Sequence, residues 1–162
     1  MGLSDRYEIE DLVVQDESGV TFRARDRQND QAVALRRFFP GSSSGSGLQG
    51  EEITAFAGMV EALKQLRHPS LCGVLDGGVD QVDGIPYLVT DWAEGKRLSE
   101  ILEEGPLVPE QAVAVAGQAM EVLVVLREKF GEVAEWLEME ATSVLVNEEN
   151  GVCSFTICPL QV

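Results

Sequence analysis

The chain has little of several residue types on which chemical sites depend. Its 162 residues include one histidine, His68, so neither a histidine-paired catalytic dyad nor a histidine-rich metal site can be assembled. Three cysteines, Cys72, Cys153 and Cys158, lack metal-type spacing and leave one unpaired in any disulfide scheme, so we expect reduced thiols in a cytoplasmic setting. None has a basic sequence neighbour that would lower its pKa, and we predict no cysteine nucleophile.

Basic residues are also scarce, with 12 Lys and Arg against 28 Asp and Glu, for a formal net charge of -16. Nucleic acids and anionic membranes bind through clustered Lys and Arg, so this balance argues against both as partners and favours a basic or neutral one. Acidity that merely keeps the surface solvated is the alternative. The N-terminus has no signal pattern, and no apolar run approaches the length of about 18 residues that a membrane span needs. We therefore predict a cytoplasmic protein.

The residues that are present suit a folded domain, since 44% are hydrophobic and 25% are charged. Alternating apolar residues and turn-type residues predict antiparallel strands, and apolar residues at spacings of three and four predict one amphipathic helix. The loop 40–47 is rich in Gly and Ser. The expected strands are Tyr7–Val14, Val20–Asp26, Ala32–Phe39, Leu71–Asp76 and Pro86–Trp92, and the expected helix is Glu51–Arg67.

After residue 94 the pattern changes to helix. A short helix, Leu98–Glu104, and a long one, Pro109–Phe130, precede a hairpin of Val144–Val146 and Val152–Ile157. The sum is an α+β fold, in which a five-stranded antiparallel sheet with one helix is followed by helices and a β-hairpin.

The long helix carries apolar residues on nearly every face, which is the pattern of a buried helix. Either the sheet side and the hairpin cover it fully, or an apolar face is left for a protein partner or a second copy of the chain. The residues predicted for that partner surface are Val113, Ala116, Met120, Leu123 and Val124.

The order of these elements and several local segments resemble the protein kinase family, of the bacterial serine/threonine type. Val33–Arg36 is similar to the family's strand with the sequence V-A-I-K, and the turn His68–Pro69 resembles the end of its regulatory helix. Gly84–Gly95 resembles the strand and hinge that lead into the larger lobe. The resemblance implies a small lobe over residues 1–93 and a truncated portion of the large lobe over residues 94–162.

The family's catalytic positions are largely replaced. In the phosphate-covering loop only Gly19 remains of three glycines, with Val14 and Asp16 at the other two positions. Arg36 replaces the strand lysine, which keeps the charge but changes its shape. Met59 stands where the resemblance places the partner glutamate, and Glu61 is two residues further along the helix.

The second half of the kinase pattern also departs from the family. Glu138 aligns with the catalytic aspartate, Ser143 with a metal-binding asparagine, and Ile157 with the magnesium aspartate. Because an isoleucine cannot bind magnesium, we expect no metal site and no cofactor.

We therefore expect a pseudokinase that is not an enzyme and that acts as an acidic, cytoplasmic binding or scaffolding module. Its long helix is expected to bind a protein partner or a second copy of the chain, which would make a dimer. The alternative is a nucleotide-binding domain with residual or atypical phosphotransferase activity that uses Arg36 and Glu138. A third interpretation is that the chain is a piece of a longer protein whose remainder covers the long helix.

Overall fold

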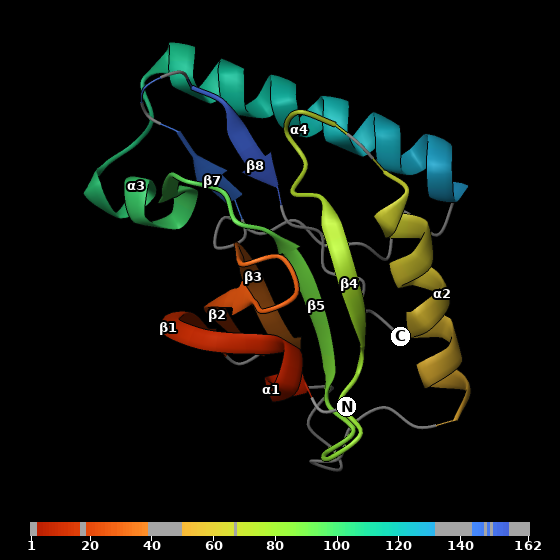
Figure 1. The fold of residues 1–162 in the computed structure, drawn as a ribbon. Helices are drawn as coiled ribbons and strands as arrows, with labels where there is room; N and C mark the ends of the chain where they lie inside the picture. The colour runs from red at the N-terminus through yellow and green to blue at the C-terminus, as the bar shows by residue number, and fades with distance from the viewer. Residues whose placement is uncertain are drawn as a thin grey trace. The chain divides into compact units, whose positions relative to one another are not determined.

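The computed structural model describes residues 3–16, 19–38, 50–66, 68–131, 144–147, 149 and 151–155. The described residues divide into two compact units, one within 1–66 and 73–92, the other within 67–72 and 93–161 (Figure 1). The first unit contains α1 (Leu3–Arg6), β1 (Tyr7–Asp16), β2 (Gly19–Asp26), β3 (Gln31–Phe38), α2 (Glu51–Lys64), β4 (Val74–Val79) and β5 (Pro86–Asp91). The second contains β6 (Lys96–Arg97), α3 (Leu98–Glu104), α4 (Pro109–Phe130), β7 (Val144–Val146) and β8 (Cys153–Phe155).

The first unit is built on an antiparallel sheet with the strand order β1-β2-β3-β5-β4. A tight turn joins β2 to β3. In it Asp30 has a φ of 59°, and its N–H donates to the carbonyl of Asp26 at 2.7 Å. This turn sets Asp26 opposite Gln31, and the antiparallel register then sets Thr21 opposite Arg36. The predicted five-stranded sheet and the α+β fold class are confirmed.

One face of this sheet holds a small apolar core. The alternation along each strand sends every second side chain to this face. Leu3, Phe22 and Tyr87 pack around it. The buried members of the core are Tyr7, Ala24, Val33, Leu35 and Val89.

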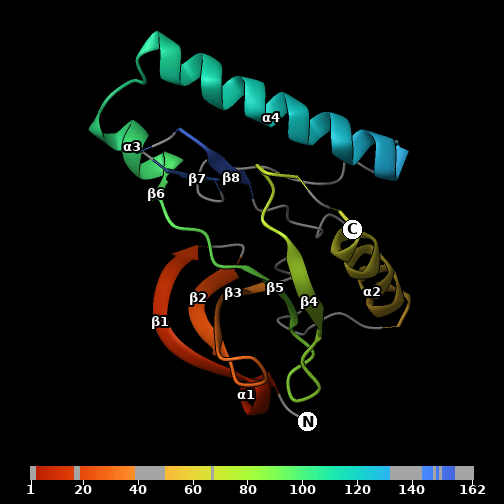
Figure 2. The ribbon, with the colours of Figure 1, turned by 45° about the horizontal axis from the view of Figure 1, so that its top comes forward.

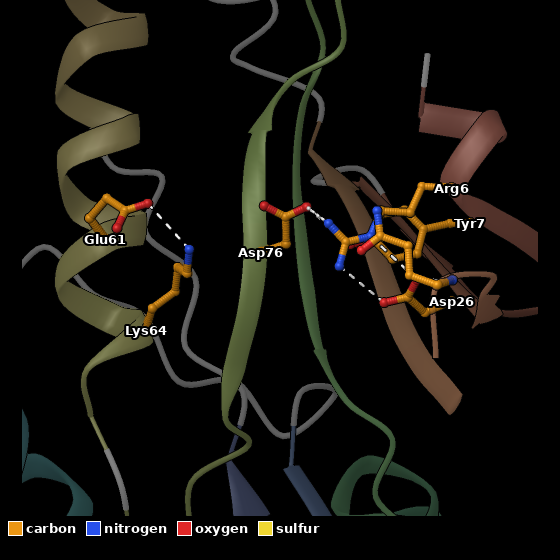
Figure 3. A network of polar contacts seen from close by, with 7 residues as sticks. Arg6, Tyr7, Asp26, Glu61, Lys64 and Asp76 are labelled. Atoms are coloured by element: carbon orange, nitrogen blue, oxygen red, sulfur yellow. Dashed lines mark hydrogen bonds and ion pairs between the residues drawn. The ribbon is translucent and has the colours of Figure 1, made fainter. Parts of the chain in front are cut away.

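Polar contacts join the two outermost strands of the sheet (Figure 3). The hydroxyl of Tyr7, on β1, donates to Asp76 Oδ2, on β4, at 3.0 Å. Arg6 Nη2 lies 3.1 Å from Asp26 Oδ2, and Arg6 Nη1 lies 3.5 Å from Asp76 Oδ2. Because β1 and β4 are at opposite ends of the strand order, the sheet must curl until its edges approach, and Figure 2 shows the curvature of β1 and β2. Burial, reinforced by Asp76, raises the pKa of Tyr7, so its phenol stays a proton donor.

Helix α2 packs on the other face of the sheet. Its buried residues Phe56, Val60 and Leu63 recur at intervals of four and three, as the periodicity predicts. The helix ends at Lys64 rather than at position 67. The N–H of Gln65 donates at 3.2 Å to the carbonyl of Ala62, three residues earlier, and this tighter turn ends the α-helical pattern.

The position of β4 is a correction to the sequence prediction, which expected a strand over Leu71–Asp76 and a connection at Gly77 and Gly78. A Cβ on Gly77 would lie 2.9 Å from a methyl of Val60, so glycine belongs inside this strand, where α2 approaches closely. Leu71 instead makes an isolated parallel bridge with Phe155 in the second unit.

In the second unit, β6, β7 and β8 form a three-stranded sheet beside α4 (Figure 2). The two-residue strand β6 is too short to be found from sequence periodicity. Gln118 of α4 joins the hairpin to the chain around position 70: its Oε1 accepts from Ser70 Oγ at 3.1 Å and from Cys153 N at 2.7 Å, and its Nε2 donates to the carbonyl of Gly151 at 3.0 Å.

Candidate functional site

The face of the first sheet that α2 covers brings together the positions that carried the kinase resemblance. Val14 is opposite Thr21, and Thr21 is opposite Arg36. Continuing across the sheet, Arg36 is opposite Leu88 and Leu88 is opposite Gly77. Residues directly opposite one another share a face, so this row points to the same side as Gly77, where Val60 of α2 packs.

A second contact places Arg36 on this face. Phe38 follows Arg36 by two residues and so shares its face, and its ring lies 6.5 Å from that of Phe56 in α2, in an edge-to-face arrangement. The guanidinium of Arg36 lies over the Phe38 ring, with Cζ 5.3 Å from the ring centroid. Its Nη1 donates to Thr21 Oγ1 at 2.9 Å. Arg36 is thus held in a half-buried position rather than solvated, and its cation faces the α2 side.

Arg23 supplies a second guanidinium on this face, which the sequence reasoning missed. It is opposite Ala34, two residues before Arg36, so the two arginines are diagonal neighbours. Arg23 Cζ lies 5.2 Å from the centroid of the Trp92 ring, and its Nε lies 3.5 Å from Glu10 Oε2. Counting outward from the turn at 27–30 would have revealed this pair, because that turn fixes the register.

The remaining glycine of the loop has a structural role. A Cβ on Gly19 would overlap the carbonyl oxygen of Arg37, so the residue must be glycine for β2 to pair with β3 at this point. Val14 is half-buried in the row described above. Asp16 ends β1 opposite Gly19, and its side chain lies outside the described part of the structure.

Met59 and Glu61 occupy different sides of α2. Met59 is half-buried and precedes the buried Val60, at the margin of the face that packs on the sheet. Glu61 is exposed, and its Oε1 lies 3.4 Å from Nζ of Lys64 (Figure 3). Glu61 is therefore engaged on the outer side of the helix.

Three of the predicted positions, Glu138, Ser143 and Ile157, lie outside the described residues, as does Cys158. Cys72 and Cys153 are free and buried, and burial raises the pKa of the Cys153 thiol, which suits packing rather than nucleophilic chemistry. Within the described ranges, no group of three or more His, Cys, Asp or Glu side chains is placed to hold a metal ion.

The predicted partner surface on α4 is exposed. Only Val122 and Leu126 of this helix are buried, so the interpretation of its sequence pattern as that of a fully buried helix is wrong. Its length and composition would also allow it to cross a membrane, contrary to our expectation that no segment approaches this limit, although core helices of soluble proteins meet the same criterion. The exposed residues include all five members of the predicted surface, Val113, Ala116, Met120, Leu123 and Val124.

Known proteins resemble this chain in sequence and in structure. Serine/threonine-protein kinase 36 of Pongo abelii is 28% identical over 119 residues, which cover 74% of this chain and 8% of that protein. A probable serine/threonine-protein kinase of Clostridium perfringens is 25% identical over 150 residues, covering 93% of this chain and 21% of that protein. A crystal structure of Rad53 in complex with AMP-PNP matches with a TM-score of 0.74 and 13% identity, covering 96% of this chain and 39% of that one.

The chain has a protein-kinase-like fold. No protein-family model matches the sequence. The kinase-like chain spans between 8% and 21% of the length of these two curated relatives.

The expectation that this kinase-like chain is not an enzyme is contradicted by these relatives, which are named as serine/threonine-protein kinases. Residue types at aligned positions do not by themselves show that a kinase-like domain lacks activity. At the one such position on β3, the structure places a cation on the α2 side of the sheet, with a hydroxyl and a ring that orient it.

Proposed function

We propose that the chain is the nucleotide-binding part of a protein kinase domain and that it contributes to phosphoryl transfer. The observation that carries the proposal is the pair of guanidiniums, Arg36 and Arg23, on the α2-covered face of the sheet. Phosphoryl transfer depends on cations placed against the phosphates, and a guanidinium recognises phosphate through its fork of donors. The sequence relatives named as kinases support this activity, and Rad53, which shares the fold, was crystallised with AMP-PNP.

The orientation of Arg36 supports its role. Thr21 Oγ1 accepts a hydrogen bond from the Arg36 guanidinium, which also lies over the Phe38 ring. Because these contacts already restrict the Arg36 side chain, less conformational entropy is lost when it binds an anion.

Thermal shift with AMP-PNP and magnesium tests the proposal. A ligand at about 100 times its dissociation constant stabilises the native state by roughly 2.7 kcal/mol, which for a chain of this size raises the melting temperature by about 5–10 °C. Arg36→Ala should remove most of this shift and Arg36→Lys should restore part of it. Arg27→Ala is the matched control, because it removes the same charge from the exposed turn between β2 and β3.

A flat response of the parent chain at millimolar AMP-PNP would refute nucleotide binding. Transfer of labelled γ-phosphate from ATP to a generic protein substrate then separates binding from catalysis: transfer that is lost in Arg36→Ala and retained in Arg27→Ala supports the full proposal.

Protein binding through α4 is a second candidate function, favoured by the exposed apolar residues of that helix. Val113 is 73% exposed and Met120 is 61% exposed. Large apolar side chains at these exposures on one helix face are typical of interaction sites. A scaffolding role in the cytoplasm would follow from such a surface, and it is compatible with nucleotide binding by the sheet. If Met120→Asp left every interaction of the chain unchanged, this candidate would be refuted.

A further inference from the structure

Helix α4 presents two opposite faces within the second unit. Val122 and Leu126 are buried, whereas Val113, Met120 and Val124, at intervals of seven and four, form an apolar stripe on the other side. Ala116 and Leu123 extend the stripe on one side, and they too are exposed. A Cβ added at Gly117, near its middle, would have no neighbour within 4 Å, so the stripe is open there.

An acidic row runs along one flank of this stripe. Glu110, Glu121 and Glu128 are separated by eleven and seven residues, and at 100° per residue both spacings return to within about 20° of the same direction. The row therefore lies roughly 60° around the helix axis from the stripe. The side chain of Glu121 is 66% exposed, although its Oε2 lies 3.5 Å from Nε2 of His68. The row is about 27 Å long at 1.5 Å per residue.

The opposite flank has a different character. Arg127, in the last turn, lies roughly 40° from the stripe on the side away from the glutamates, and Ala112 lies further round on that side. The charge is therefore asymmetric across the helix, which defines the orientation that a charged partner would take.

Charge distinguishes three possible occupants of the stripe: a second copy, an anionic lipid surface and a basic helix. A second copy would bring two chains of net charge -16 together, and in an antiparallel pairing of identical helices it would place glutamate rows near one another. An anionic lipid surface would be repelled by the same row. A helix with Lys or Arg along one flank has neither cost.

We propose that the apolar stripe of α4 docks a basic amphipathic helix of another protein, about five turns long, whose Lys or Arg residues face Glu110, Glu121 and Glu128. The inference rests on the second candidate function, protein binding through α4, and adds the chemistry of the partner. Apolar residues of the partner at intervals of three, four and seven meet the stripe, and its cations meet the acidic row.

Three labelled 18-residue helical peptides test the inference by fluorescence anisotropy. They share one apolar stripe and carry Lys, Gln or Glu along one flank. We expect the Lys peptide to bind most tightly and the Glu peptide least. The double variant Glu110→Lys with Glu128→Lys should weaken binding of the Lys peptide by roughly fivefold to fiftyfold and leave the Gln peptide unchanged. Glu103→Lys, an exposed site on α3, is the matched control and should have no effect.

The outcomes separate the inference from the function on which it rests. Equal affinity for the Lys and Gln peptides would overturn the basic partner while leaving protein binding through α4 standing. If no peptide bound at concentrations up to about 100 µM, the dissociation constants would be too weak for a specific interaction, and protein binding through α4 would be refuted. A dimer in light scattering that Met120→Asp dissociates would make a second copy the occupant, and Met120-dependent binding to phosphatidylglycerol vesicles would make it a membrane; either result overturns the inference.

Discussion

The ion pair between Arg6, at the end of α1, and Asp26, at the end of β2, can be tested quantitatively. Asp26 is buried, with 4% of its side chain exposed, and Arg6 Nε and Nη2 donate to its two oxygens at 3.3 and 3.1 Å. Asp26 Oδ1 also accepts from the backbone N–H of Gln28 at 3.0 Å. Replacing Asp26 with Asn conserves the volume and one acceptor but removes the charge and the second acceptor. The change therefore isolates the electrostatic part of the contact.

A hydrogen bond to a charged group contributes about 1.5–3 kcal/mol, and the one-third exposure of Arg6 moves the expected loss to about 1–2 kcal/mol. At roughly 2–4 °C per kcal/mol, Asp26→Asn should lower the melting temperature by about 2–8 °C at pH 7. Glu8→Gln is the control, because Glu8 of β1 forms an exposed pair with Arg25 of β2, the strand that also carries Asp26. Its melting temperature should stay close to that of the parent.

The pH dependence of this loss is a second readout. The hydrogen bond from Arg6 lowers the pKa of Asp26 below its ordinary value of 3.8. A carboxylate with a lowered native pKa contributes stability that is complete well above 3.8 and is lost as the pH falls through the native pKa. In circular dichroism melts, the gap between parent and Asp26→Asn should therefore be constant from pH 7 to 5 and shrink below about pH 4. A gap that persists undiminished at pH 2, or no gap at pH 7, would refute the electrostatic account.

Two further substitutions probe the strand pairing and the second unit. Gly19→Ala should lower the free energy of unfolding by about 1–3 kcal/mol, because its Cβ would overlap the carbonyl of Arg37. Gly58→Ala, at an exposed position of α2 where an added Cβ has no neighbour within 4 Å, should raise it by up to about 1 kcal/mol. Urea unfolding that showed the same sign of change for both variants would contradict this explanation. Gln118→Leu should cost about 1–3 kcal/mol, because it leaves the buried N–H of Cys153 without its acceptor and removes one donor from the carbonyl of Gly151. Hydrogen exchange should show faster exchange at Cys153, and the exposed Gln111→Leu on the same helix should leave it unchanged.

The sequence predicted the fold well where the periodicity was strong. The helices Leu98–Glu104 and Pro109–Phe130 have the predicted bounds, and β1, β2, β3 and β5 differ from prediction by two residues or fewer at each end. β4 was misplaced because its glycines resemble a turn, and only the approach of Val60 explains why glycine is favoured inside that strand. No local pattern carries that information.

The curl of the sheet could not be predicted for a related reason. Tyr7 and Asp76 are 69 residues apart, and only the folded sheet brings the hydroxyl and the carboxylate to 3.0 Å. Likewise, the four hydrogen-bonding positions of Gln118 are filled by groups from the helix itself, the chain near Ser70 and the β7–β8 hairpin. A lone glutamine on a long helix gives no sign of this role in the sequence.

The candidate site was only partly accessible from the sequence, because alignment by residue type assigns each position separately. Taken alone, Arg36 is a replaced lysine. The register that the turn at 27–30 imposes adds Thr21 opposite it and Arg23 diagonal to it, so Arg36 shares its sheet face with at least one further cation. The charge needed near a phosphate is a property of that face, so its loss or retention has to be judged on the face. For this chain the decisive comparison is therefore between Arg36→Ala and the double change with Arg23→Ala, since a further loss of AMP-PNP-induced stabilisation in the double variant would show that both guanidiniums contribute to nucleotide binding.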